Sequence, residues 1–583
     1  MAVRIFLSII FSLLLNLGFG QETLKYRWAF DRIENLEGTS LLPIDSTDYF
    51  QLREDSTFRY QLKAKDNLIA EGTWIQRNDS LILNYTLPAD TTRFYKLITA
   101  NDTLLAINEG PVNFTFRKKP TQSSVASSGL PVNYDFTGGS ISMASLARGI
   151  LGISVLVFLG FLFSSKKRKI NWPLVIKGLI IQVLFALAIL KVPAVRVIFD
   201  FLSEKFVTLL GFTREGAEFL FGGLITNTES LGYIFAFQVL PTVIFFSALT
   251  SLMFYYGILQ KIVYAFAWVM KRTMKLSGAE SLAAAGNVFL GQTESPLLVK
   301  PYIGKMTMSE LLCLMSGGMA TIAGGVLAAY IGFLGGTEVA QQIFFAKHLL
   351  AASVMSAPAA VVAAKLLLPE TEKVNEDMAI EQSRIGTNAL EAISNGTTEG
   401  LKLAVNVGAM LLVFLAFIAF ANSIFAFIGD PHQLIVGNSV WIDYKGFNDW
   451  VAEVSNGRYE EFSLQFILGY SLAPITWLMG VDSRDMVLVG QLLGEKTILN
   501  EFVAYVSLGD MKQASAFASP KSIIIATYIL CGFSNFASIG IQIGGIGSLA
   551  PSRKADLSKL GFKALIGGTL ASLFTAVIVG MLI

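Results

Sequence analysis

Long apolar segments recur along most of the chain. Eight of them are long enough to cross a lipid bilayer: 145–164, 172–191, 232–258, 309–334, 345–367, 403–428, 520–546 and 562–583. A helix needs about 20 apolar residues to span a hydrocarbon layer of about 30 Å. The pattern therefore predicts a membrane domain at 143–583 with eight spanning helices.

The first 142 residues follow different patterns. Residues 1–20 combine Arg4 with an apolar run and small residues, in the order typical of a signal peptide. The alternative is an uncleaved anchor helix, although the apolar run is short for a span. Either interpretation exports residues 22–119. Residues 120–142, rich in Ser, Thr, Gly and Pro, are expected to be a linker.

Residues 22–119 hold 27 charged residues, and apolar residues alternate with polar ones in 58–62 and 81–85. This alternation predicts an antiparallel, all-β domain in water. With its Gly72-Thr73-Trp74 element, the segment resembles the small lipocalin-like β-domains of exported bacterial proteins. Its barrel is expected to have either a filled core or, as the alternative, a ligand pocket.

The amino-acid composition excludes several classes of protein. Hydrophobic residues make up 53% of the 583 residues and charged residues only 15%, too few to coat a soluble body of this size. The 45 Lys+Arg and 43 Asp+Glu nearly cancel, so no nucleic acid polymer is expected as a partner. Cys313 and Cys531 lie in apolar runs, and we interpret His348 and His432 as interfacial or surface groups. We expect no disulfide framework, no cofactor and no enzymatic activity.

Basic residues predict the orientation. They cluster on one predicted side of the membrane, at 166–169, 271–275, 300–305 and 553–559. By the positive-inside rule this side is cytoplasmic, which agrees with an exported head. The head and the C-terminus are then both expected in the periplasm, outside a bacterial inner membrane. Between the second and third spans, 192–224 mixes charged and apolar residues at helical spacing, which predicts an interfacial amphipathic helix.

Two apolar segments have polar centres that a spanning helix does not tolerate. In 277–303 the centre is 286–296, which includes Glu294, and in 462–511 it is 490–502, which includes Glu501. Unsatisfied polar groups in lipid cost several kcal/mol, so such a break must be enclosed by protein or line a wet cavity. We predict two re-entrant hairpins. The alternative for the first is a cytoplasmic loop between two short helices.

Each predicted hairpin is followed by a span with small and polar residues at its middle, 317–325 and 532–540. A hairpin plus a broken helix therefore occurs twice, in opposite orientations. Such inverted repeats are typical of secondary transporters, in which half-helix ends meet near the middle of the membrane to hold substrate and ion.

Three runs, 291–297, 500–505 and 534–540, closely resemble the concentrative nucleoside transporter family. The resemblance covers about 145–583 and leaves out the head. It implies a homotrimer that imports nucleosides on a cation gradient, sodium or alternatively proton.

The resemblance also implies the site residues. Gln292, Thr293 and Glu294 would face the base. Glu501, Asn535 and Ser538 would hold the ribose hydroxyls, and Val326 and Phe533 would form apolar walls. A sodium ion would be held by Asn287, the Leu290 carbonyl, Thr321 and the Ile322 carbonyl. Thr321 stands where bacterial relatives often have serine, which keeps the hydroxyl and adds a methyl group.

The chemistry of these residues agrees with that assignment. Carboxylates and amides pair with ribose hydroxyls and base edges, and sodium prefers oxygen ligands. The alternatives are a helix-capping role for Glu501 and helix-to-helix hydrogen bonds for Asn535 and Ser538. We interpret Glu399 as a solvated acid at a helix start, with a coupling site as the alternative. Two other functions stay open: a membrane sensor whose β-domain binds a ligand, and an ion channel.

Overall fold

The computed structural model describes residues 27–118 and 142–583, apart from gaps at 36–39, 43, 45–47, 53–56, 63–64, 66–67, 78–79, 88, 101–103, 228–233, 337, 376–385, 431, 437–438, 445 and 456. The chain forms two compact units, Met1–Ser124 and Val125–Ile583. The expected signal peptide and nearly all of the expected linker lie outside the described residues.

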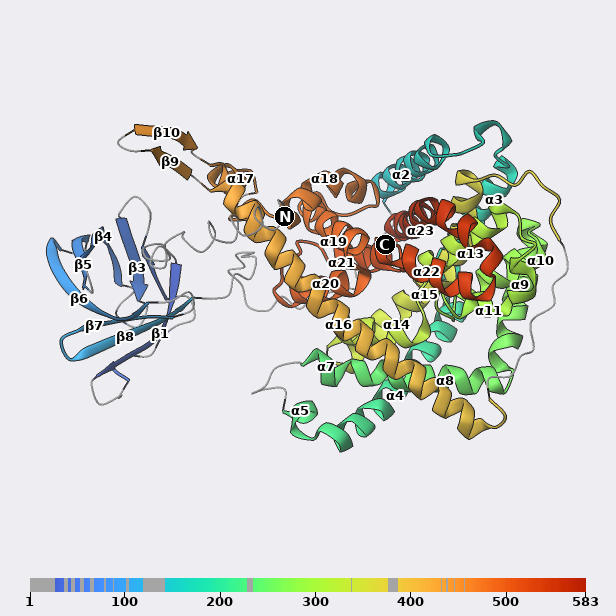
Figure 1. Ribbon diagram of the computed structural model, residues 1–583, viewed down its shortest axis with the longest axis horizontal. Helices are drawn as coiled ribbons and strands as arrows, with labels where there is room; N and C mark the ends of the chain where they lie inside the picture. Colours follow the sequence, from blue (N-terminus) through green and yellow to red (C-terminus); the bar gives the residue numbers. More distant parts are fainter. Residues whose placement is uncertain are drawn as a thin grey trace, which may run out of the picture. The chain divides into compact units, whose positions relative to one another are not determined.

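The first unit is a closed barrel of eight strands (Figure 1). The strands are β1 (Arg27–Asn35), β2 (Tyr49–Leu52), β3 (Thr57–Leu62), β4 (Leu68–Arg77), β5 (Ser80–Leu87), β6 (Thr91–Ala100), β7 (Leu104–Glu109) and β8 (Val112–Lys118). Each pairs antiparallel with the next, and β8 pairs with β1 to close the barrel. The predicted all-β architecture is confirmed for these residues.

Aromatic side chains pack the barrel interior. The rings of Phe50 and Phe116 stack with their centroids 5.0 Å apart, and Trp28 is fully buried. The hydroxyls of Tyr85 and Tyr95 lie 2.9 Å apart, and burial raises the pKa of both above the ordinary value for tyrosine, so both stay protonated. This packing favours a filled core over a ligand pocket.

The second unit is helical. Its elements are α2 (Met143–Leu162), η2 (Lys167–Lys169), α3 (Trp172–Lys191), α4 (Pro193–Phe221), α5 (Gly223–Thr226), α7 (Phe235–Gln238), α8 (Leu240–Tyr255), α9 (Ile258–Met274), α10 (Gly278–Asn287), α11 (Ser295–Leu298), α12 (Lys300–Ile303), α13 (Met308–Ala320), α14 (Gly324–Gly335), α15 (Val339–Leu367), α16 (Ala389–Gly429), β9 (His432–Val436), β10 (Ser439–Tyr444), α17 (Asn448–Val454), α18 (Leu464–Leu478), α19 (Met486–Ile498), α20 (Glu501–Gln513), α21 (Pro520–Leu530), α22 (Phe536–Leu549), η3 (Pro551–Arg553) and α23 (Lys554–Leu582). The expected amphipathic helix is present as α4.

Seven helical segments of the described residues are long and apolar enough to cross a membrane. They are Met143–Leu162, Trp172–Lys191, Phe235–Tyr255, Met308–Gly335, Val339–Leu367, Ala389–Gly429 and Pro551–Leu582. The predicted span at 520–546 is not one helix, because it is divided into α21 and α22 by residues 531–535. Gly532 has φ +100° there, a backbone conformation that a continuous right-handed helix excludes.

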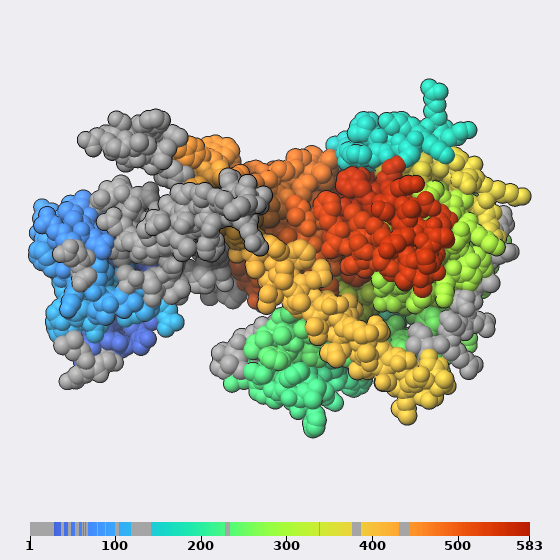
Figure 2. All heavy atoms as spheres, in the orientation of Figure 1, coloured from blue at the N-terminus to red at the C-terminus, as the bar shows by residue number. Residues whose placement is uncertain are grey.

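Burial separates central helices from peripheral ones. In the most apolar window of α15 and of α23, 89% of the residues are buried, whereas in α16 the share is 11%. Figure 2 shows α16 lying across the surface of the membrane unit. Lipid or another protein surface must therefore cover the apolar side chains of α16.

The two ends of the membrane unit lie at the same end of its helix bundle. Gly149 in the second turn of α2 packs against Met581 in the last turn of α23. At the other end of α2, the Ser165 amide donates to the Leu367 carbonyl (2.9 Å). Residues 166–169 therefore lie at the opposite end of the bundle from Ile583, as the predicted topology requires.

The two predicted hairpins differ in construction. The first reverses direction between α10 and α11, as expected. The segment 462–511, predicted as a single hairpin, instead holds three helices, because Gly480 (φ +103°) and the turn at 482–485 separate α18 from α19. The polar reversal lies between α19 and α20, where the Asn500 side chain accepts from the Val503 amide and caps α20.

Candidate functional site

Two broken helices touch at their breaks. Residues 321–323 separate α13 from α14, and residues 531–535 separate α21 from α22. A Cβ added to Gly532 would lie 2.6 Å from the backbone carbon and oxygen of Ala320, so only glycine permits this approach. The contact brings the ends of four half-helices together inside the protein, where their free amides and carbonyls can meet a ligand.

A buried lysine that the sequence reasoning did not single out stabilises one of these breaks. The Lys496 ammonium donates to the carbonyls of Ile529 (2.9 Å) and Cys531 (3.1 Å) and to the Ser572 hydroxyl (3.1 Å). It thereby satisfies the last carbonyls of α21, which have no partner within the helix. A lysine within an apolar hairpin arm was the sequence feature that could have revealed it.

The second hairpin and α22 together build a polar cluster. The Asn535 amide donates to the Glu501 carboxylate (2.7 Å), and both side chains are buried. The Asn535 oxygen accepts from the Ser538 amide (2.9 Å) and so caps α22. The Tyr330 hydroxyl interacts with Glu501, and its ring stacks on Tyr505 with centroids 4.1 Å apart. Tyr330 was not among the predicted site residues.

The first hairpin reaches the same cluster. The buried Gln292 amide donates to the Ser538 hydroxyl (3.2 Å), and the Gln292 oxygen has no hydrogen-bond partner. Thr293 lies against Gly545 of α22, while Glu294 folds back over Gly291. The side chains of Thr293 and Glu294 are accessible. Ser538 is therefore where the residues expected to face the base meet those expected to hold the ribose.

The two apolar residues of the predicted site lie beside the breaks. Val326 is buried in the first turn of α14, and Phe533 is buried between α21 and α22. The Phe533 carbonyl accepts from the backbone N–H of Asn535 (3.0 Å), and this hydrogen bond holds the bend just before α22. Phe533 therefore lies two residues before Asn535 of the polar cluster.

The residues expected to bind sodium gather where α10 meets α13. Asn287, the last residue of α10, is buried, and neither its amide nitrogen nor its oxygen has a hydrogen-bond partner. Gly317 of α13 lies against it, and the Thr321 hydroxyl donates to the Gly317 carbonyl (3.0 Å). The Gly324 amide donates to the Phe289 carbonyl (3.3 Å), which ties the break to the hairpin turn. Leu290 and Ile322 are buried on either side of that contact.

This arrangement fits a small hard cation. An unpartnered amide oxygen is costly inside a protein, and a cation that prefers oxygen ligands would satisfy it. The carbonyls at the end of α13 are free of intrahelical partners where the helix stops at Ala320. Among the described residues no group of three or more His, Cys, Asp or Glu side chains could hold a metal ion.

Three secondary interpretations can be compared with the structure. His348 is not an interfacial group: it is buried, and its Nδ1 lies 3.1 Å from the Tyr528 hydroxyl, because α15 is a central helix. Glu399 pairs with Lys402 (2.8 Å) and is exposed, as a solvated acid would be. It does not lie at a helix start, because α16 begins at Ala389. Asp482 and Arg484 form an ion pair at 3.0 Å. The side chain of His432 lies outside the described residues.

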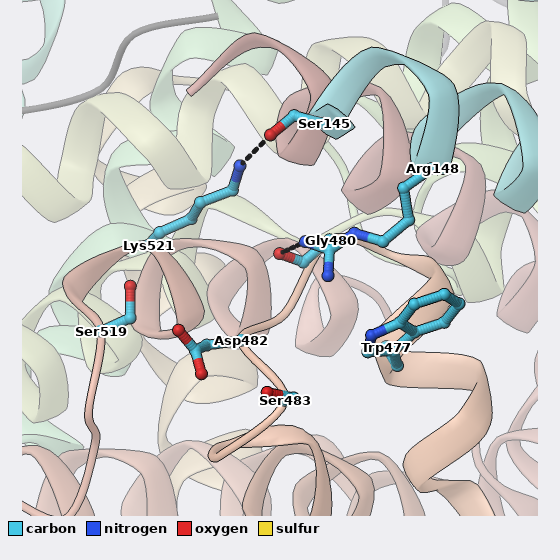
Figure 3. Close-up of a pocket in the computed structure, with 8 residues that line it drawn as sticks. All are labelled: Ser145, Arg148, Trp477, Gly480, Asp482, Ser483, Ser519 and Lys521. Carbon is cyan, nitrogen blue, oxygen red and sulfur yellow. Dashed lines mark hydrogen bonds between the residues drawn. The ribbon is translucent and has the colours of Figure 1, made fainter. Parts of the chain in front are cut away.

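A polar cavity of about 330 Å³ is lined by none of the predicted site residues (Figure 3). It is lined by Ser145, Arg148, Trp477, Gly480, Asp482, Ser483, Ser519 and Lys521. The Arg148 guanidinium donates to the Gly480 carbonyl (2.5 Å) and lies over the Trp477 ring, 5.5 Å from its centroid. Lys521 donates to the Ser145 hydroxyl (3.3 Å). These contacts anchor the start of α2 to the loop after α18 and to the start of α21.

Models of known families match most of the membrane unit. The "Na+ dependent nucleoside transporter N-terminus" matches residues 151–224, "Nucleoside recognition" matches 236–337, and the "Na+ dependent nucleoside transporter C-terminus" matches 348–580. The barrel lies outside all three matches.

Individual proteins are similar over the same region. An uncharacterized transporter of Haemophilus influenzae is 38% identical over 443 residues, covering 75% of this chain and 98% of that protein. Solute carrier family 28 member 3 of Eptatretus stoutii is 40% identical over 447 residues, covering 74% of this chain and 60% of that protein. The chain thus spans about three fifths of the length of this vertebrate relative. A solved structure of CNTnw, in an inward-facing substrate-bound state, is 35% identical with a TM-score of 0.66, covering 75% of this chain and 99% of the other.

Proposed function

Because this chain belongs to the concentrative nucleoside transporter family, we propose that its membrane unit is a secondary active symporter that imports nucleosides on a sodium gradient. One observation carries the proposal. Gln292 of the first hairpin and the Glu501–Asn535 pair of the second hairpin and α22 converge on Ser538, beside the contact of two broken helices. Family membership favours this function over a sensor or a channel.

The cluster suits a nucleoside. Glu501 offers carboxylate oxygens to ribose hydroxyl donors, and Asn535 and Ser538 can both donate and accept. The unpartnered oxygen of Gln292 is available to a base N–H group, with Thr293 and Glu294 beside it. Val326 and Phe533 would supply apolar surface. Asn287, Thr321 and the Leu290 and Ile322 carbonyls would hold the sodium ion, next to the first hairpin that contacts the substrate.

Uptake of labelled uridine and adenosine into proteoliposomes tests the function directly. A sodium gradient directed inward should drive accumulation above the external concentration, and removing the gradient should leave only equilibration. Failure to accumulate either nucleoside under a sodium gradient, in vesicles shown to contain folded protein, would overturn the proposal.

Substitution of Thr321 by valine is expected to raise the sodium concentration for half-maximal uptake about 5- to 10-fold, because the change removes one oxygen ligand worth about 1 kcal/mol. Nucleoside affinity at saturating sodium should change less. Thr575→Val is the matched control, since Thr575 on α23 is equally buried and also donates to a carbonyl four residues earlier. An unchanged sodium dependence in Thr321→Val would remove Thr321 from the site.

The orientation is part of the proposal. We place the head and Ile583 in the periplasm and residues 166–169 in the cytoplasm. In this topology the two re-entrant hairpins have opposite orientations, and α21 and α22 together form an eighth crossing after the second hairpin. A cysteine at the exposed Ser165 should then resist an impermeant thiol reagent in intact spheroplasts of a bacterial host and react after lysis. Labelling before lysis would contradict this topology.

We infer that the barrel is a separate exported domain, with 1–20 as signal peptide, 22–119 as the lipocalin-like domain and 120–142 as linker. The family matches begin only at residue 151, which supports the view that transport does not require the head. Deletion of 22–119 with the export segment retained should leave sodium-driven uridine uptake within about twofold of the full chain per molecule in the membrane. Loss of uptake at normal membrane abundance would show that the head takes part in transport.

The oligomeric state is inferred from the same family resemblance. We propose a homotrimer in the bilayer, supported by the peripheral α16, whose apolar side chains need a cover. Native mass spectrometry from detergent should show three chains. The relatives are named as a transporter and a solute carrier, and no catalytic step or cofactor is proposed.

A further inference from the structure

A buried ammonium group occupies the break between α21 and α22. Lys496 is fully buried in the last turn of α19. It donates to the Ile529 carbonyl (2.9 Å), the Cys531 carbonyl (3.1 Å) and the Ser572 hydroxyl (3.1 Å). A lysine ammonium has three N–H donors and no acceptor, so these three neutral oxygen atoms satisfy it completely.

No carboxylate forms an ion pair with this ammonium in the part of the chain that the structure describes. The charge of Glu501 acts on Lys496 electrostatically, but only from beyond ion-pair distance. An ammonium taken out of water without a counter-ion is costly, and an apolar side chain would pack α19 against α21 without that cost. The positive charge itself is therefore what this position uses.

The two repeats have the same construction at this point. In the first, Asn287 ends α10 and lies against Gly317 of α13, just before the break at 321–323. In the second, Lys496 lies near the end of α19, which packs against α21, just before the break at 531–535. Each side chain thus comes from the first arm of its hairpin and reaches the half-helix that ends at the break.

The two side chains differ in charge. Asn287 is neutral, and its side-chain oxygen has no hydrogen-bond partner, which leaves an oxygen ligand for the proposed sodium ion. Lys496 brings a positive charge of its own to the carbonyls of Ile529 and Cys531. The oxygen atoms that would suit a hard cation at the second break are thereby already occupied.

We propose that Lys496 is a built-in cation that takes, at the second break, the place that a sodium ion takes at the first. The second repeat then needs no ion from solution. Removing the ammonium while leaving its space open creates a second sodium site, formed by the Ile529 and Cys531 carbonyls and the Ser572 hydroxyl. The inference rests on the proposed sodium-driven transport and assigns a different source of positive charge to each break.

Thermal unfolding of the full chain in detergent tests the proposal, with choline replacing sodium to keep the ionic strength constant. Ions that bind only the folded state raise the unfolding temperature with the logarithm of their concentration. Lys496→Ala should unfold at a lower temperature than the wild type without sodium. Its unfolding temperature should then rise about twice as steeply with sodium, because two ions bind instead of one.

Two control variants separate a cation site from simple loss of a buried lysine. Lys496→Met fills the space with an apolar side chain, so it should be destabilised but should rise with sodium only as steeply as the wild type. Lys512→Ala removes a partly buried lysine of α20 that donates to the Leu334 carbonyl (2.8 Å), and it should keep the wild-type slope. Equal slopes for Lys496→Ala and Lys496→Met would make Lys496 a structural donor only and overturn the proposal.

The wild type offers a second test that needs no variant to fold. Uptake of radioactive sodium and labelled uridine into proteoliposomes should give a ratio of about one ion to each uridine. A ratio of about two would show that the second break takes up sodium despite Lys496, and would overturn the proposal while leaving the symporter intact. Absence of uridine uptake would instead contradict the proposed function, and the sodium slopes in detergent would still decide the role of Lys496.

Discussion

Replacement of Glu501 by glutamine is expected to weaken the binding of every nucleoside by about 10- to 100-fold. The carboxylate accepts from the Asn535 side-chain amide at 2.7 Å and interacts with the Tyr330 hydroxyl, and its remaining lone pairs are assigned to ribose hydroxyls. Glutamine keeps the shape but replaces a charged acceptor with a neutral amide. Each charge-assisted hydrogen bond lost in this way costs about 1.5–3 kcal/mol. Because all nucleosides share the ribose, their affinities should fall together.

Isothermal titration of uridine and adenosine against the purified protein measures this effect. Gln292→Met is the informative contrast, because the unpartnered Gln292 oxygen is assigned to the base. That variant should change the ratio of uridine to adenosine affinity more than it changes their average. Asp510→Asn, on the same helix as Glu501, controls for loss of a negative charge. If Glu501→Gln left both affinities intact, or Gln292→Met scaled both by one factor, the division of ribose and base between the two hairpins would be wrong.

Replacement of Gly532 by alanine is expected to lower the free energy of unfolding by about 2–5 kcal/mol and to abolish uptake. Gly532 has φ +100°, which an L-residue rarely adopts. Its added Cβ would lie 2.6 Å from the Ala320 backbone and 2.7 Å from the Met319 carbonyl oxygen. Backbone atoms cannot rotate away as a side chain can, so the two broken helices would have to separate.

Thermal unfolding in detergent, followed by intrinsic fluorescence, measures the loss of stability. Gly540→Ala is the matched control: it lies in α22, and a Cβ there meets no atom within 4 Å. Alanine is a better helix former than glycine by about 1 kcal/mol, so this variant should be at least as stable as the wild type. Equal unfolding temperatures for the two variants would mean that the contact between the breaks is not needed for the fold.

The features that could be predicted from sequence are those that depend on local composition. An apolar stretch of about 20 residues is a property of that stretch alone, so seven spanning segments were found at their observed positions. Alternation of polar and apolar residues likewise predicted the strands of the barrel. The polar centres of 277–303 and 462–511, together with three motifs, were enough to indicate the family before any geometry was known.

Tertiary structure alone decided which distant residues meet. The sequence contained Lys496 and Tyr330, but their roles depend on what faces them: the end of α21 and Glu501. The same holds for Gly532, whose need for glycine comes from Ala320, more than 200 residues earlier in the chain. Burial and hydrogen-bond partners are set by the packing of remote segments, which a local pattern does not encode.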